Sequence, residues 1–310
     1  MKVVVTGAGG FVGRALSARL LQIGHTVIAA DTDLAAAPDG VAGVVGDLGD
    51  PSVRRQMLMG GCDAVIHLAT VPGGAAEADP AASRRINCDA TYDLIRDTAA
   101  FSPGARFVFA SSIAVFGDPP LEGVDDETPL TPRMIYAGHK AMMEQAVSMY
   151  SRRGSIDGVT VRLPGIVARP AGSAGMKSAF LSELVHALSA NRPFTCPVSE
   201  DGTVWVQSID RCVDNVINAL MLDSAMLPPS RAVTLPATWV SIGDLVAEIT
   251  RQCHASISPA YEPDIELEKA FASLPRLSSR QAQAAGFRDD GDLPALVARV
   301  LGRGEALAKG

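Results

Sequence analysis

The chain has 310 residues, with 27 Lys and Arg against 34 Asp and Glu, which gives a formal net charge of −7. Hydrophobic residues make up 47% of it and charged residues 20%, a composition that can build a sizeable core and excludes intrinsic disorder. A mildly acidic surface repels a phosphate backbone, so we expect no nucleic-acid partner. The length indicates one large domain or two coupled ones.

The sequence predicts neither membrane association nor export. No uninterrupted apolar run approaches the ~20 residues that cross a bilayer. The first residues lead directly into the strand-like segment at 3–7, without a signal-peptide pattern. The five cysteines are scattered and form no CxxC pair, so we expect neither disulfides nor a metal site. These features favour a cytoplasmic protein with no membrane partner.

Short apolar runs rich in β-branched residues alternate with longer helical patterns through the first half of the chain. The first helix is expected at 11–23, and strands are expected at 3–7, 26–31, 43–48, 64–69, 106–112 and 159–164. Runs that are apolar throughout, rather than alternating, are typical of strands buried on both faces of a parallel sheet. The pattern predicts the α/β class with a Rossmann-type doubly wound parallel sheet.

This rhythm breaks after Pro164, where a smaller C-terminal unit is predicted to interleave with the first. Helical patterns end at Leu188 and cover 209–221, a further strand is expected at 232–235, and prolines separate the helices after Ser241. We assign the Rossmann domain to residues 1–165 and 204–237, and a substrate-binding domain to residues 166–203 and 238–310.

A glycine-rich turn, TGAGGFVG at 6–13, joins the first strand to the first helix. Gly7 permits the tight turn, Gly10 lets the backbone approach a pyrophosphate, and Gly13 lets the helix pack closely on the sheet. The pyrophosphate would lie at the helix N-terminus, where free N–H groups and the helix dipole favour anions. Asp31, at the end of the second strand, is placed to bind an adenosine ribose and to repel a 2′-phosphate. This context favours a dinucleotide site over a glycine turn without a ligand, and the cofactor NAD over NADP.

Tyr136 and Lys140 stand four positions apart, on one face of a predicted helix. A phenol with its usual pKa near ~10 is a poor base at neutral pH. A nearby ammonium lowers that pKa and makes the phenol a usable acid or base. Such a pair occurs often by chance, but here it follows a strand that ends in Ser111 and Ser112.

Together these motifs resemble the extended short-chain dehydrogenase/reductase family of the NAD-dependent epimerase/dehydratase type, over nearly the whole chain. The resemblance is carried by TGAGGFVG at 6–13, Asp31, Asp47-Leu48, His67-Leu68-Ala69, Asn87, SSIAVFG at 111–117 and YAGHK at 136–140. Phe116 stands where the family usually has tyrosine. His67 and His139 are expected to be structural rather than catalytic.

The resemblance implies that Ser112, Tyr136 and Lys140 are catalytic. Tyr136 would exchange the proton on the reacting oxygen, Ser112 would hydrogen-bond that oxygen, and Lys140 would hold the nicotinamide ribose while tuning Tyr136. Asp47 and Leu48 would line the adenine pocket, and Asn87 would support the lysine. The complete implied cofactor set is Gly7, Gly10, Phe11, Val12, Gly13, Asp31, Asp47, Leu48, Leu68, Ala69, Asn87, Ser111, Tyr136, Lys140, Pro164 and Ile166. A homodimer formed through two helices per subunit is also implied.

Two positions bear on the substrate. Nucleotide-sugar members of the family bind the diphosphate with an asparagine and an arginine, where this chain has Gly165 and Val204. A diphosphate needs cations or several donors. SSIAVFG and residues 150–170 and 197–208 resemble a narrower subgroup. That subgroup oxidises the C2 hydroxyl of a small sugar acid such as D-erythronate to the 2-oxo acid.

Three functions stay open on the sequence alone. The first is oxidation of a small sugar acid by NAD, with substrate contacts expected from Thr70, Gly73, Ser112, Tyr136 and Arg169. For Arg169, a salt bridge within the protein is an equally good interpretation. The second is an NAD-dependent nucleotide-sugar epimerase or dehydratase. The third is a redox-sensing binding protein, against which the intact catalytic set argues. Trp205 is equally compatible with a pocket wall and with ordinary packing.

Overall fold

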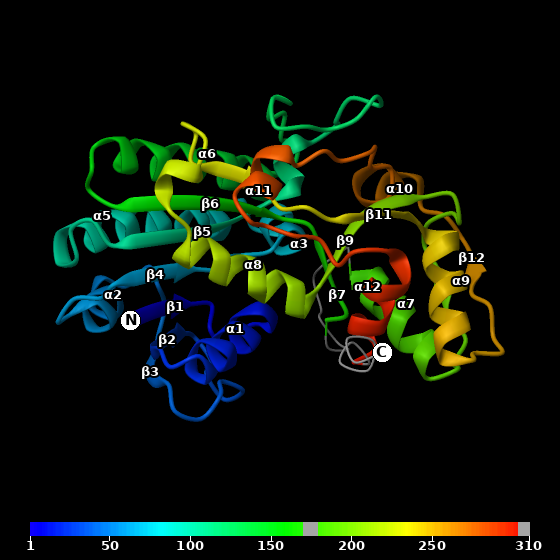
Figure 1. Cartoon of the computed structure of the whole chain (residues 1–310), viewed down its shortest axis with the longest axis horizontal. Coiled ribbons are helices and arrows are strands. Elements are labelled where there is room, and N and C mark those ends of the chain that lie inside the picture. Colours follow the sequence, from blue (N-terminus) through cyan, green and yellow to red (C-terminus); the bar gives the residue numbers. More distant parts are fainter. Residues whose placement is uncertain (170–178, 303–310) are drawn as a thin grey trace.

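In the computed structural model, which describes residues 1–169 and 179–302, seven strands form one parallel sheet with helices on both faces (Figure 1). The strand order is β10-β6-β5-β4-β1-β2-β3. The bounds are β1 (Lys2–Thr6), β2 (Thr26–Asp31), β3 (Ala42–Val45), β4 (Ala64–His67), β5 (Arg106–Ser112), β6 (Asp157–Leu163) and β10 (Ala232–Thr234). The order reverses between β1 and β4, and ligands of doubly wound sheets bind at the carboxyl ends of the strands beside such a reversal. The predicted fold class is confirmed.

Each face of this sheet is buried under its own layer of helices. Val3, Val5 and Val108 belong to the core under α1 (Phe11–Gln22) and α8 (Ile209–Met221). The alternate residues of the same strands pack under α2 (Pro51–Leu58), α5 (Thr91–Phe101) and α6 (Ile135–Arg152). Because successive side chains of a strand point to opposite faces, an unbroken apolar run fills both cores.

A second, three-stranded sheet of order β11-β9-β7 lies beside the first (Figure 1). It consists of β7 (Gly165–Val167), β9 (Thr203–Ser208) and β11 (Thr238–Ser241), and it packs on α7 (Phe180–Ser189), α9 (Ile242–Cys253) and α12 (Leu293–Val300). The sequence predicted no strand in these three places. Because β9 pairs with strands on both sides of it, this sheet joins segments that the expected domain division separates. That division stays a prediction, and part of its C-terminal domain lies outside the described residues.

The remaining elements are short. They are α3 (Gly73–Ala78), α4 (Pro80–Arg84), the π-helical turn η1 (Arg85–Ala90), the 3-10 turns η2 (Ile113–Phe116) and η4 (Ser224–Met226), β8 (Thr195–Cys196), β12 (Ala260–Tyr261), α10 (Ile265–Phe271) and α11 (Arg280–Ala284). None of the helices within 1–169 and 179–302 has the length and apolar character needed to span a membrane.

Candidate active site

Two adjoining cavities open at the carboxyl ends of β1, β2, β4 and β5. The larger has a volume of about 560 Å³ and the smaller about 340 Å³. All of the expected cofactor residues except Asn87 line the larger cavity. Five residues line both cavities and so mark their junction: Pro72, Ser112, Tyr136, Pro164 and Arg169.

The glycine turn forms a cradle with no room for side chains at two of its positions. Gly7 has φ +73°, and a Cβ there would lie 2.6 Å from the Ala69 backbone nitrogen. A Cβ on Gly13 would lie 2.1 Å from the Gly7 carbonyl oxygen. Gly10 precedes α1 without a side-chain cap, so the first N–H groups of the helix are open to an anion. This cradle fits a dinucleotide pyrophosphate.

Asp31 extends from the end of β2 into the larger cavity. One carboxylate oxygen accepts a hydrogen bond from the Gly9 N–H at 2.9 Å, and the other accepts one from the Thr32 N–H at 2.7 Å. These bonds fix the carboxylate in the position where a dinucleotide presents its adenosine ribose.

The loop after β3 forms the neighbouring part of the wall with Asp47 and Leu48. Arg85, which the sequence analysis did not identify, also lines the cavity and pairs with Asp47 at 2.9 Å. The hydrogen bond from Arg85 is the main cause that lowers the pKa of Asp47. Only the fold brings η1 to this loop, so no motif in the sequence signals the pair.

Asn87 lies behind the wall rather than in it. Its Oδ1 accepts hydrogen bonds from the Val71 N–H at 2.7 Å and the Thr70 hydroxyl at 3.0 Å, and its Nδ2 donates to the Val71 carbonyl at 2.9 Å. Asn87 therefore fixes the 70–71 loop. The support of Lys140 that the resemblance implied for it stays a prediction. Thr70, an expected substrate contact, lines the larger cavity.

Ser112, Tyr136 and Lys140 meet where β5 ends and α6 begins. Ser112 is the last residue of β5, while Tyr136 lies in the first turn of α6 and Lys140 in the next turn. Lys140 is only 3% exposed; its Nζ donates to the Ala110 carbonyl at 2.7 Å and lies 5.7 Å from the centroid of the Tyr136 ring. The fold thus brings together three side chains that the sequence separates by a long loop.

The surroundings of this trio shift two of its pKa values. Burial lowers the pKa of Lys140 to about 7. Burial raises the pKa of Tyr136, while its interaction with the Ser112 hydroxyl and the positive charge of Arg169 lower it. The sequence predicted that Lys140 lowers the tyrosine pKa; in the structure, Ser112 and Arg169 are the groups that do so.

The smaller cavity is walled mainly by apolar side chains, and Arg169 lies at its junction with the larger one. Further charged residues that line it are Asp118, Arg133, Glu266 and Lys269. Gly73, an expected substrate contact, also lines it. Trp205 combines the two roles left open by the sequence, because it lines this cavity while buried edge-on against Phe116. Its Nε1 donates to the Pro275 carbonyl at 2.7 Å.

Gly165 and Val204 both line the smaller cavity. A Cβ on Gly165 would lie 3.0 Å from the Trp205 carbonyl oxygen, so a larger side chain needs a local shift. Val204 is apolar and buried in β9. Neither position provides the amide or guanidinium that a diphosphate needs.

Both histidines have structural surroundings. His67 is buried, with its ring nitrogens 2.6 Å from the Thr6 hydroxyl and 2.9 Å from the Thr91 hydroxyl, and burial lowers its pKa to about 3. His139 lies 3.0 Å from the Ser83 hydroxyl. Neither ring lines either cavity, in agreement with the sequence analysis.

Comparisons with known proteins agree with this geometry. The model of the NAD dependent epimerase/dehydratase family matches residues 3–222. The D-erythronate dehydrogenases of Haemophilus influenzae and Cupriavidus necator are each 32% identical to the chain, covering 97% and 96% of it and 99% and 97% of their own lengths. The solved structure titled nucleoside-diphosphate-sugar epimerase from Agrobacterium tumefaciens is 28% identical, with a TM-score of 0.88 over 99% of this chain and 95% of that one.

These relatives identify an enzyme of the dehydrogenase or epimerase type that works with a nicotinamide cofactor. The chain belongs to the NAD-dependent epimerase/dehydratase family.

Proposed function

We propose that this enzyme uses NAD⁺ to oxidise the C2 hydroxyl of a small sugar acid, such as D-erythronate, to the 2-oxo acid by Ser-Tyr-Lys catalysis. The observation that carries the proposal is the junction of the two cavities, which Ser112, Tyr136 and Arg169 all line. A hydrogen-bonding hydroxyl, a phenol and a cation are therefore within one substrate's reach of the cofactor cavity. The two D-erythronate dehydrogenases support the choice of substrate.

The larger cavity fits NAD in its donor set. The N-terminus of α1 holds the pyrophosphate, Asp31 accepts hydrogen bonds from the adenosine ribose, and Lys140 binds the nicotinamide ribose. When bound, the nicotinamide accepts the hydride that leaves C2 of the substrate. The protein's own part is then to hold the hydroxyl oxygen and to take its proton.

Tyr136 takes that proton at its Oη, and Ser112 donates a hydrogen bond to the same oxygen. Loss of the proton and the hydride converts the alcohol to a ketone, so the balanced products are the 2-oxo acid, NADH and one proton that Tyr136 passes to solvent. Arg169 binds the substrate carboxylate, since a guanidinium matches a carboxylate with two parallel donors. Gly73 contacts the substrate from the wall of the smaller cavity, and Thr70 from the wall of the larger one.

The choice of NAD over NADP rests on Asp31. Its carboxylate would repel a 2′-phosphate, so NAD⁺ should have a much higher kcat/KM than NADP⁺. Asp31→Ala should narrow that difference by lowering kcat/KM for NAD⁺ more than kcat/KM for NADP⁺. Equal use of both cofactors by the wild type would overturn the assignment.

We assign the working enzyme to the cytoplasm as a homodimer. Its five cysteines are free thiols, as suits a reducing compartment. The family resemblance implies dimerisation through two helices per subunit, one of which is α6, the helix of Tyr136 and Lys140. This helix exposes the apolar side chain of Met142, and the neighbouring α5 exposes Tyr92.

A substrate screen tests the proposal against nucleotide-sugar chemistry. NADH formation should be followed with NAD⁺ and a panel of three- to six-carbon sugar acids, and binding of UDP-, dTDP- and GDP-sugars should be measured by calorimetry. We expect turnover with a four-carbon acid and little heat from nucleotide sugars. Tight nucleotide-sugar binding without NADH from any acid would instead support an epimerase or dehydratase.

A further inference from the structure

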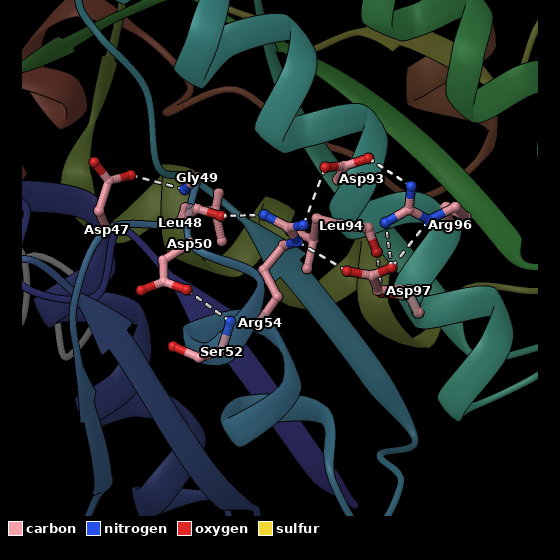
Figure 2. A network of polar contacts seen from close by, with 11 residues as sticks. Asp47, Leu48, Gly49, Asp50, Ser52, Arg54, Asp93, Leu94, Arg96 and Asp97 are labelled. Carbon is pink, nitrogen blue, oxygen red and sulfur yellow. Dashed lines mark hydrogen bonds and ion pairs between the residues drawn. The ribbon is translucent and has the colours of Figure 1, made fainter.

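Arg54 is a buried cation that the proposed reaction does not use. It lies on α2 and is 1% exposed, yet its guanidinium makes bonds in three directions (Figure 2). Nε donates to Asp97 at 2.8 Å and Nη2 donates to Asp93 at 3.0 Å, both on α5. The third bond runs from Nη1 to the backbone carbonyl of Leu48 at 2.8 Å.

Burying a guanidinium requires that its charge and its donors be satisfied, because its hydration is lost. Asp93 and Asp97 supply the opposite charge from one side. Nη1, the nitrogen that neither carboxylate binds, donates to a main-chain oxygen in the loop between β3 and α2. The bond that satisfies this nitrogen also joins α2 and α5 to the loop that contains Leu48.

The carbonyl that Arg54 holds belongs to the wall of the cofactor cavity. Leu48 and Asp47 both line that cavity. Arg85 also pairs with Asp47, but its side chain is 54% exposed, and exposed ion pairs fix geometry weakly. The buried bond from Arg54 is therefore the firmer restraint on this part of the loop.

We propose that Arg54 is a positioning residue for the adenosine half of the cofactor. By fixing the Leu48 carbonyl it holds Asp47 and Leu48 in the shape that receives the adenine, without touching the cofactor itself. The inference rests on the proposed cofactor site and is independent of the substrate. It predicts that affinity for the adenosine half depends on a side chain behind the cavity wall.

The test compares Arg54→Lys with the wild type in calorimetric binding of ADP-ribose. Lysine keeps the charge, but a single ammonium cannot reproduce the fork that reaches two carboxylates and a carbonyl. We expect ADP-ribose to bind about tenfold more weakly, and the KM for NAD⁺ to rise by about the same factor with kcat within about twofold, as for a loss of uniform binding. Binding of nicotinamide mononucleotide should be unchanged.

Arg96→Gln is the matched control. Arg96 bonds to the same two carboxylates, at 2.8 Å in each case, but its side chain is 53% exposed. None of its hydrogen bonds within the described chain reaches Leu48. This variant should bind ADP-ribose like the wild type, whatever its effect on the α5 ion pairs.

Three results would overturn the inference. Unchanged ADP-ribose affinity in a folded Arg54→Lys variant, with only a lower Tm, would reduce Arg54 to a structural tie. If Arg54→Lys does not fold, the same assay is run on Asp97→Asn, which weakens the hold on the Arg54 guanidinium but keeps a hydrogen-bond acceptor. A weaker affinity of Asp97→Asn for ADP-ribose would support the inference, and an unchanged affinity would refute it. A wild type that does not bind ADP-ribose would refute the cofactor site itself, whereas failure of the sugar-acid screen alone would leave this inference standing.

Discussion

Tyr136 and Lys140 occupy one face of α6, but different surroundings act on their polar atoms. The Lys140 ammonium is enclosed and bonded to the Ala110 carbonyl, so burial dominates its pKa. The Tyr136 phenol lies at the junction of the cavities, where burial raises its pKa and the Ser112 hydroxyl and the Arg169 charge oppose part of that rise. Proton transfer therefore depends on groups from β5 and from the segment after β7 as well as on the Tyr-Lys spacing.

Tyr136→Phe removes the phenol while leaving the ring in place. Because positioned proton transfer contributes ~10²–10⁴ in rate, kcat should fall by about that factor. Affinity for NADH should remain near the wild-type value, since the phosphate and ribose contacts are intact. Steady-state kinetics and fluorescence titration measure the two quantities. Substantial turnover in this variant would contradict the assigned role.

The pKa of Lys140 predicts a pH-dependent stability difference in the cofactor-free protein. The folded-state pKa of about 7 lies below the ~10.4 of an unfolded lysine, so the unfolded chain binds more protons between these values. Wild-type stability should therefore rise with pH across that window relative to Lys140→Met. Between pH 6.5 and 9.5, the unfolding free energy of the wild type should rise by on the order of 2–3 kcal/mol relative to that of Lys140→Met. Parallel stability profiles in urea denaturation would show that Lys140 is not desolvated as described.

Three elements have the bounds that the sequence predicted: β2, β5 and α8. Each is bounded by a clear change in pattern. The expected strand at 43–48 ends at Val45, because the next residues turn back: the Asp50 N–H donates to the Asp47 carbonyl at 2.9 Å, and Asp50 then caps α2. The turn that shortens this strand also forms the adenosine wall.

The three strands of the small sheet were not predicted, for a physical reason. β7 has three residues and β11 has four, too few to display a period. Their pairing with β9 depends on contacts between segments far apart in the chain. The same limit explains why the sequence could not decide between a cavity wall and ordinary packing for Trp205. The burial of Arg54 was missed because an arginine on an amphipathic helix normally indicates a solvated face.

Two glycines test the local packing of the first and sixth helices. Gly13→Ala would bring a Cβ within 2.1 Å of the Gly7 carbonyl, so it should destabilise the protein by about 1–3 kcal/mol and weaken ADP-ribose binding. Gly138 lies within α6 with no atom in reach of an added Cβ, so Gly138→Ala should stabilise by about 0.5–1 kcal/mol. Thermal unfolding measures the stability of both variants. Equal changes in Tm for Gly13→Ala and Gly138→Ala would contradict this description of the glycine turn.

The residues that line the larger, cofactor cavity were more predictable from the sequence than those that line the smaller cavity. The larger cavity is built by the loops at the carboxyl ends of a doubly wound sheet, and these loops carry short motifs at fixed places. All but one of the predicted cofactor residues line this cavity. The smaller cavity takes residues from η2, β9 and α10, which no local pattern connects. Its apolar walls, Phe116 and Trp205 among them, could be assembled only by the fold.

The proposed dimer can be tested at an exposed side chain of α6. Met142 is 58% exposed there, and an exposed apolar side chain on a surface that associates becomes buried in the contact. We expect a dimer by light scattering at micromolar concentration and a shift toward monomer in Met142→Glu. Met221, which is 59% exposed on α8 at the opposite face of the sheet, provides the control, because Met221→Glu should remain dimeric. A monomeric wild type would contradict the proposal.

Isotopic labelling follows the net hydride transfer from C2 of a small sugar acid to NAD⁺ that we propose. D-Erythronate carrying deuterium at C2 should be incubated with the enzyme and NAD⁺, and the released dinucleotide and acid analysed by mass spectrometry. We expect one deuterium in each NADH formed, with an equal amount of unlabelled 2-oxo acid. Label that stays in the sugar acid, with no labelled NADH released, would contradict it.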